Sequence, residues 1–348
     1  MSARLMLRLV LAAFLAIAAS AAEAGSYSVT ATDDSWTNEA SVNQNNGIVT
    51  TLRATASSSN ASRTRSLIIF TLPTIPSNEQ IVSATLKLNT TTTSTRTVTV
   101  NRLLATWSET TVTWSNYGTA NFNATAEATF TPSAAGSVSV DVTALVQGWY
   151  AGTYTNFGLG LIGATSSTAI FSSAEATTTT TRPQLVITTA TIAPSLTIAK
   201  AGIQLSDPVN GTTNPKAIPG AKIRYTITAS NSSAGIVDTN TTQFTESVPS
   251  TMKLFVGDAG AVGSGPVVFT NGATSSGLSY TFTSLASTTD SIAFSNNNGS
   301  TYAYTPVADA SGYDATVTNV RITLSGPFAG KTGATGPSFT LQLFMGVK

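Results

Sequence analysis

Short stretches in which every second residue is apolar recur along most of the chain. Residues 84–88 and 138–142 show this alternation clearly. A period of two is typical of a half-buried β-strand, because successive side chains of a strand point to opposite faces. Turn-forming residues, such as Asn46-Gly47 and Pro73, separate these stretches at the spacing of a β-sandwich. The pattern therefore predicts an all-β fold.

One segment departs from this period. Residues 142–149 place apolar side chains three and four positions apart, which favours a short helix with Trp149 in the core. Asp141 or Thr143 could cap its start, and Gly148 or Gly152 would end it. We expect one short helix here.

A second group of alternating stretches begins at Ser195 and shares no motif with the first. The chain is therefore predicted to hold two β-sandwich modules in series and not an internal repeat. We place them at residues 25–189 and 196–348, with a linker at 190–195. The first is expected to have jelly-roll-like topology and to contain the short helix.

The N-terminus has the pattern of a secretory signal peptide. Arg4 and Arg8 precede an apolar run over residues 9–19, and Ala22-Glu23-Ala24 follows. The run is about half the length that spans a bilayer. We expect cleavage after residue 24 and a mature chain without a transmembrane segment. It would be secreted or held at the cell surface, with the periplasm as an alternative.

Composition excludes several kinds of chemistry. The chain contains no Cys and no His, which removes Ser-His-Asp triads, Cys nucleophiles and metal sites built on His or Cys. Charged residues make up 9% of the chain, against about 25% in ordinary proteins. Without residues 1–24, basic and acidic side chains are equal in number. A nucleic-acid partner is not expected, because it would need a dense basic patch.

Residues 106–114 read TWSETTVTW, with tryptophans at positions 107 and 114. An exposed indole can stack on a sugar ring, whereas a buried one can clamp two strands together. We favour the clamp for Trp114 and, less strongly, for Trp107, with Glu109 accepting nearby hydrogen bonds. Trp36, in a polar stretch close to Tyr27, is the better candidate for a surface platform.

Several features of the first module occur in a recognisable order. They are RSLIIF at 65–70, the strand at 81–88, TWSETTVTW, DVTALVQGW at 141–149, GLGL at 158–161, and FSS at 171–173 followed by Glu175, Arg182 and Pro183. Together they resemble the DNRLRE-domain family, which is related to the disaggregatase repeat. That resemblance covers about residues 27–190 and implies a carbohydrate-binding module, some members of which bind alginate-type polysaccharide. Thr71 and Ala174 depart from the family pattern.

The resemblance implies a polysaccharide or cell-envelope glycan as partner. Two alternatives remain open: a purely structural surface or adhesion protein and, less favoured, a polysaccharide-degrading enzyme. No pair of carboxylates is singled out by its spacing as acid and base, so a non-catalytic protein is expected. An ion pair of Glu175 with Arg182 is also predicted. The candidate glycan-binding residues are Tyr27, Trp36, Arg53, Arg63, Arg65 and Trp107.

Two oxygen-rich loops could hold a structural calcium ion, which takes six to eight oxygen ligands. Asp and Asn also gather in turns for backbone reasons, so the loops have an alternative explanation without metal. The candidate ligands are Asp33, Asp34, Asn43 and Asn45 in one loop, and Asp309 and Asp314, with Ser311, in the other.

The second module begins with LTIAKAGIQLSDPVNG at 196–211, followed by a Pro219-Gly220 turn, YTI at 225–227 and Asn231. This resembles the conserved-repeat domain of bacterial surface proteins, which implies an immunoglobulin-like stalk or assembly module. Self-association or a surface-protein partner is then expected. Lys200 could form an isopeptide bond with Asn231 if a carboxyl group lay beside them, although a lysine at a strand edge usually just reaches solvent.

Overall fold

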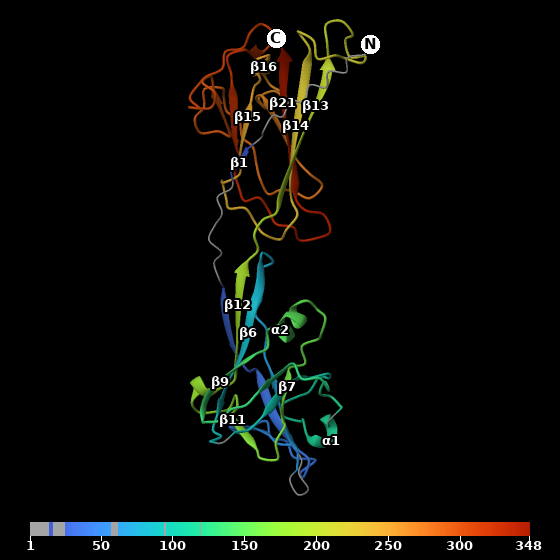
Figure 1. Cartoon of the computed structure of the whole chain (residues 1–348), viewed down its shortest axis with the longest axis vertical. Helices are drawn as coiled ribbons and strands as arrows, with labels where there is room; N and C mark the ends of the chain where they lie inside the picture. Colours follow the sequence, from blue (N-terminus) through green and yellow to red (C-terminus); the bar gives the residue numbers. More distant parts are fainter. Residues whose placement is uncertain (1–13, 17–24, 57–61, 94, 119) are drawn as a thin grey trace. The chain divides into compact units, whose positions relative to one another are not determined.

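A computed structural model describes residues 14–16, 25–56, 62–93, 95–118 and 120–348 (Figure 1). The chain divides into two compact units between Ala190 and Thr191. We call residues 23–190 the N-terminal unit, and residues 191–348 together with the strand at 14–16 the C-terminal unit. Nearly all of the regular secondary structure in both units is β-strand, which confirms the all-β prediction.

The N-terminal unit contains two sheets. The first has five strands in the spatial order β3 (Asp33–Asn38), β5 (Thr64–Ile69), β10 (Leu159–Gly163), β7 (Val98–Arg102) and β8 (Ala128–Phe130). The second has the order β2 (Ser26–Thr30), β12 (Gln184–Thr191), β6 (Glu79–Thr90), β11 (Ala169–Ser172) and β4 (Thr51–Ala54), and β9 (Gly136–Asp141) also pairs with β6.

The main core of this unit contains the apolar positions that the alternation identified. Ala84, Leu86 and Leu88 of β6 are buried against Ile68 and Leu161 of the five-stranded sheet. A smaller apolar cluster, which includes Leu67 and Phe122, packs on that sheet separately from the main core. The strand period thus predicted correctly which side chains are buried.

Helix α2 (Thr143–Tyr150) forms where the period changes, and Trp149 is buried in the main core as predicted. The Asp141 carboxylate accepts hydrogen bonds from the N–H and hydroxyl of Thr143, which fixes the first turn. Two further short elements were not predicted: α1 (Trp114–Tyr117) and the 3-10 helix η1 (Thr179–Thr181). In the part of the chain that the structure describes, no helix is long and apolar enough to cross a membrane.

The C-terminal unit also contains two sheets. One has the order β13 (Leu196–Ser206), β14 (Lys222–Asn231), β21 (Ser338–Val347), β16 (Met252–Phe255) and β19 (Tyr313–Asp314), with β17 (Val267–Asn271) also paired to β21. The other has the order β1 (Phe14–Ala16), β15 (Gln243–Ser247), β20 (Asn319–Thr323) and β18 (Ile292–Ser295).

Strand β1 comes from the segment predicted to be a signal peptide. It pairs antiparallel with β15, with Leu15 opposite Phe244. The other residues of that segment lie outside the described residues, so the signal peptide stays a prediction. A large apolar core, which includes Phe244, Phe328 and Phe339, fills the C-terminal unit.

Candidate functional site

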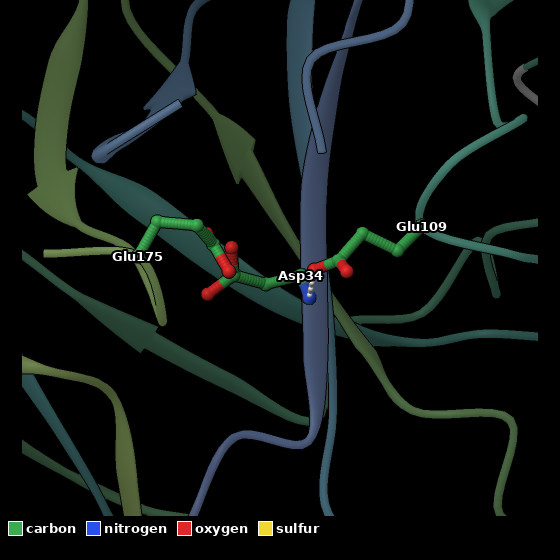
Figure 2. A group of neighbouring side chains, drawn as sticks. All are labelled: Asp34, Glu109 and Glu175. Atoms are coloured by element: carbon green, nitrogen blue, oxygen red, sulfur yellow. Dashed lines mark hydrogen bonds between the residues drawn. The ribbon is translucent and has the colours of Figure 1, made fainter. Parts of the chain in front are cut away.

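Strand β3 brings one carboxyl group into contact with two others that are distant in sequence. Figure 2 shows Asp34 between Glu109 and Glu175. One oxygen from each residue lies within 4.8 Å of the other two. The backbone N–H of Asp34 donates to Glu109 Oε1 at 3.0 Å, and the N–H of Ala174 donates to Asp34 Oδ2 at 2.7 Å. We call Asp34, Glu109 and Glu175 the carboxyl cluster.

The cluster depends on a strand where the sequence predicted a loop. Residues 33–38 read DDSWTN and looked too polar for a strand, yet they pair with β5 from Asp33 opposite Ile69 to Asn38 opposite Thr64. Asp34 is only 1% exposed, and its neighbours Ser35 and Thr37 are buried as well. Pairing with the adjacent strand outweighs the weak strand propensity of this sequence.

Glu109 is held in place by the loop at residues 45–47. Asn45 Nδ2 donates to the carbonyls of Glu109 and Val112, at 2.6 and 2.9 Å. Gly47 packs so closely that a Cβ there would clash with the backbone carbonyl of Glu109. The prediction that Glu109 satisfies nearby donors is confirmed by its bond from Asp34.

Burial dominates the titration of the cluster. Burial and, to a smaller extent, the neighbouring carboxyls of Glu175 and Glu109 raise the pKa of Asp34 to about 8, against the lowering effect of the Ala174 N–H. Burial also raises the pKa of Glu109. A neutral Asp34 at pH 7 follows, because two adjacent carboxylates cannot both stay charged in a poorly solvated site.

The carboxyl oxygens of the cluster are better suited to sharing a proton than to binding a calcium ion. Calcium takes six to eight oxygen ligands, and here Asp34 Oδ2 and Glu109 Oε1 already accept backbone N–H groups. Of the predicted calcium ligands in this region, Asp34 is in the cluster, whereas Asn45 binds backbone carbonyls through its amide. Asn43 is exposed.

The second predicted calcium loop uses its carboxylates for other contacts. Asp309 forms an ion pair with Lys253 at 2.6 Å and accepts the N–H groups of Ser311 and Tyr313. Asp314 accepts the Tyr304 hydroxyl and the N–H of Val307 at 2.8 and 2.7 Å. Ordinary turn and side-chain hydrogen bonds therefore account for this group of acids.

A different surface of the N-terminal unit combines aromatic and cationic groups. The guanidinium carbons of Arg63 and Arg65 lie 5.4 and 5.8 Å from the centre of the Trp114 ring. Arg63 and Arg65 alternate with the buried Thr64, so both point to the same side of β5. Arg63 also forms an ion pair with Glu39 and keeps 39% of its side chain exposed. We call Arg63, Arg65 and Trp114 the guanidinium–tryptophan surface.

The end of the TWSETTVTW segment positions Trp114 on this surface. Thr113 caps α1: its hydroxyl accepts the N–H of Asn116, and the Asn116 side chain accepts the N–H of Thr113 at 2.8 Å. This reciprocal cap is encoded by a threonine followed three positions later by an amide. It fixes the backbone of Trp114, whose ring is partly exposed.

Trp107 has the structural role that we favoured. Its indole N–H donates to the carbonyl of Phe157 at 2.9 Å, and its ring packs against the smaller apolar cluster on the five-stranded sheet. Both tryptophans are partly exposed, and Trp114 differs in having two guanidinium groups beside its ring. The clamp that we favoured for Trp114 stays a prediction.

The predicted platform at Trp36 is wrong. Trp36 lies inside β3, is 7% exposed and belongs to the main core, and the Arg53 guanidinium lies 4.8 Å from its ring centre. Tyr27 is half-buried and donates its hydroxyl to Glu79 at 3.2 Å. Of the six candidate glycan-binding residues, the structure brings Arg63 and Arg65 together on one surface, and it adds Trp114, which the sequence had left out.

Two further pairings differ from the sequence predictions. Glu175 lies in the carboxyl cluster, while Arg182 donates to the carbonyl of Ala176. Lys200 contacts Glu246, but Asn231 is four positions further along β14 than Ile227, the residue opposite Lys200. Asn231 instead donates to the carbonyls of Gly235 and Ala329. The predicted pair Glu175–Arg182 is therefore wrong, and these contacts do not support the less favoured isopeptide bond between Lys200 and Asn231.

Comparison with known families agrees with the boundaries of the N-terminal unit. Residues 26–189 match the model of carbohydrate-binding module family 96. This match supports a carbohydrate-binding module. It also suggests a non-catalytic role for these residues, and it does not extend to the C-terminal unit. A search of curated proteins found no match to the chain.

Proposed function

We propose that the chain is an exported, non-catalytic protein that binds polysaccharide through the guanidinium–tryptophan surface. The observation that carries this proposal is the pair of guanidinium groups beside the partly exposed Trp114 ring. An aromatic face covers the apolar side of a sugar ring, and guanidinium groups bind carboxylates or sulfates with two parallel hydrogen bonds. The surface therefore favours an acidic polysaccharide.

Charge on this surface supports an acidic ligand. Arg63 forms an ion pair with Glu39, and the Arg63 hydrogen bonds lower the pKa of that carboxyl to about 2. Arg63, Arg65 and Glu39 together carry one net positive charge at neutral pH. A negatively charged sugar adds a second anionic partner, and the interaction weakens as salt screens it.

The carboxyl cluster argues against glycoside hydrolysis in this unit. A protonated Asp34 beside two other carboxyl groups resembles an acid–base arrangement. However, Asp34 is 1% exposed and its oxygens point toward Glu175 and the Ala174 N–H, so a sugar cannot reach it. The structural calcium predicted from the sequence stays a prediction.

The C-terminal unit completes the proposal as a stalk or assembly module at the cell surface or in an extracellular matrix. Its strands contain few charged side chains, and its large core has no cysteine to cross-link it. Such a unit gains its stability from burial of apolar surface. This suits a spacer that keeps the glycan-binding unit away from its point of attachment.

Affinity electrophoresis tests the binding proposal. Residues 25–348 should be retarded in gels that contain an acidic polysaccharide more than in gels with a neutral one. Trp114→Ala should abolish most of the retardation. Lys87→Ala removes a positive charge from an exposed position on β6 and should behave like the wild type. Unchanged mobility of the wild type in every polymer, or equal loss in both variants, would contradict the proposal.

A further inference from the structure

Among the described residues, the longest edge strand is β13 of the C-terminal unit. It is the last strand of its sheet and pairs with β14 on one side only (Figure 1). It is 11 residues long, and seven of these residues are exposed. Ile198 and Ile203 are 37% and 45% exposed. An edge of this length displays a row of backbone N–H and C=O groups that can pair with another strand.

Proteins usually protect such an edge with proline or with an outward-pointing charge. The sequence of β13, LTIAKAGIQLS, contains no proline and a single charged residue, Lys200. That charge is turned inward, because Lys200 forms an ion pair with Glu246 and lies 4.6 Å from the ring centre of Tyr225. The only register irregularity is at the C-terminal end, between Gln204 and Ser206.

We propose that β13 pairs antiparallel with the β13 strand of a second copy of this chain, about a two-fold axis at Ala201. The strand is self-complementary in this register. Ile203 meets Ala199 of the other copy, and Lys200 meets Gly202, so no like charges are opposed and large side chains face small ones. In this isologous contact, the unpaired backbone N–H and C=O groups of β13 in each copy bond to those of β13 in the other copy.

A second copy fits this edge better than an unrelated partner. The exposed side chains of β13 are small or neutral, and they offer no charge pattern by which a different protein would be selected. In the described chain β1 pairs with the edge of β15. Residues 25–348 lack β1, so the Ala201 variants are needed to assign the contact to β13. The proposal does not depend on glycan binding. A dimer would nevertheless carry two glycan-binding units and gain affinity for a repeating polymer through avidity.

Sedimentation velocity of residues 25–348 tests the dimer. The wild type should sediment with twice the mass of one chain at micromolar concentration. Ala201→Lys places two lysines opposite each other at the axis and should give a monomer. Val262→Lys adds the same charge at a position that is 100% exposed and lies outside β13, so it should remain dimeric.

Charge exchange tests the position of the axis. Ala201→Glu alone should also be monomeric, whereas an equimolar mixture of Ala201→Lys and Ala201→Glu should recover the dimer, because opposite charges then meet. A monomeric wild type overturns the proposal. So does a dimer that survives Ala201→Lys, or a mixture that stays monomeric. Polysaccharide retardation of the monomeric variants separates failure of this proposal from failure of glycan binding.

Discussion

Each unit contains a carboxyl side chain that is only 1% exposed, Asp34 in one and Glu246 in the other, and these two groups are neutralised in different ways. Asp34 lies beside two other carboxyls and stays neutral by holding a proton, since burial raises its pKa to about 8. Glu246 is equally buried but contacts Lys200, and burial raises the pKa of Glu246 while it lowers that of Lys200. The comparison shows that burial alone does not decide the charge state. The neighbouring group decides whether a bound proton or a nearby cation offsets the free-energy cost of burying a charged carboxylate.

The largest expected loss of stability follows from removing the positive charge of Lys200. Lys200→Met leaves Glu246 buried with no positive partner and should lower the free energy of unfolding of the C-terminal unit by about 3 kcal/mol at pH 7. The loss should shrink at pH 4, where Glu246 takes up a proton. All four tryptophans lie in the N-terminal unit, so circular dichroism should report the shift while tryptophan fluorescence stays unchanged.

A double variant provides the control for this effect. Lys200→Met combined with Glu246→Leu replaces the pair by apolar groups, and most of the lost stability should return. Equal losses in the single and double variants would show that Lys200 contributes through packing and not through its charge.

A smaller effect is expected from removing the proton-binding group in the N-terminal unit. The pKa of Asp34 is near 4 in the unfolded chain and about 8 in the folded one, so the folded state binds more protons between these values. Stability should therefore fall as pH rises from about 4 to about 8. Asp34→Asn should remove this loss, so it should stabilise the unit relative to the wild type at pH 8 and by much less at pH 5.

Tryptophan fluorescence during urea unfolding measures this difference. Asp33→Asn is the matched control, because it removes a carboxylate one position away on β3 and should keep the wild-type dependence on pH. Added calcium gives a second readout at pH 8: stabilisation of the wild type that disappears in Asp34→Asn would support the predicted ion. A wild-type stability that rises between pH 5 and pH 8 would contradict the neutral state of Asp34.

The smallest effect should come from an exposed ion pair of the same chemistry. Lys253 and Asp309 lie 2.6 Å apart, with 26% and 43% of their side chains exposed. Lys253→Met should cost less than about 1 kcal/mol, because water can solvate the remaining carboxylate. Circular dichroism during urea unfolding measures this cost. A loss as large as that of Lys200→Met would show that burial is not what separates the two pairs.

The sequence predicted the strands and the core better than the sites. Period two identified Leu86 and Leu88 as buried, and a period near 3.6 identified Trp149, because local spacing determines which face a side chain occupies. The carboxyl cluster was not predicted, since Glu109 and Glu175 lie 75 and 141 positions from Asp34 along the chain and meet it only through tertiary packing. Trp36 was misplaced for the same reason.

Trp114 shows the limit of reading tryptophans from spacing. Its segment identified a module, yet the exposure of each ring depends on partners elsewhere: the Phe157 carbonyl holds Trp107, whereas Arg63 and Arg65 lie beside Trp114. The alternation of Arg63 and Arg65 around Thr64 was a usable signal, because it predicts two guanidinium groups on one strand face.

Isothermal titration calorimetry with an acidic polysaccharide tests the central claim most directly. Arg63→Gln combined with Arg65→Gln should weaken binding by residues 25–348 at least ~10-fold, as expected for loss of charge-assisted hydrogen bonds worth about 1.5–3 kcal/mol each. Lys87→Ala should leave the affinity unchanged, and raising the salt concentration should weaken the wild type more than the double variant. Equal affinities and equal salt dependence for the wild type and the double variant would contradict the account.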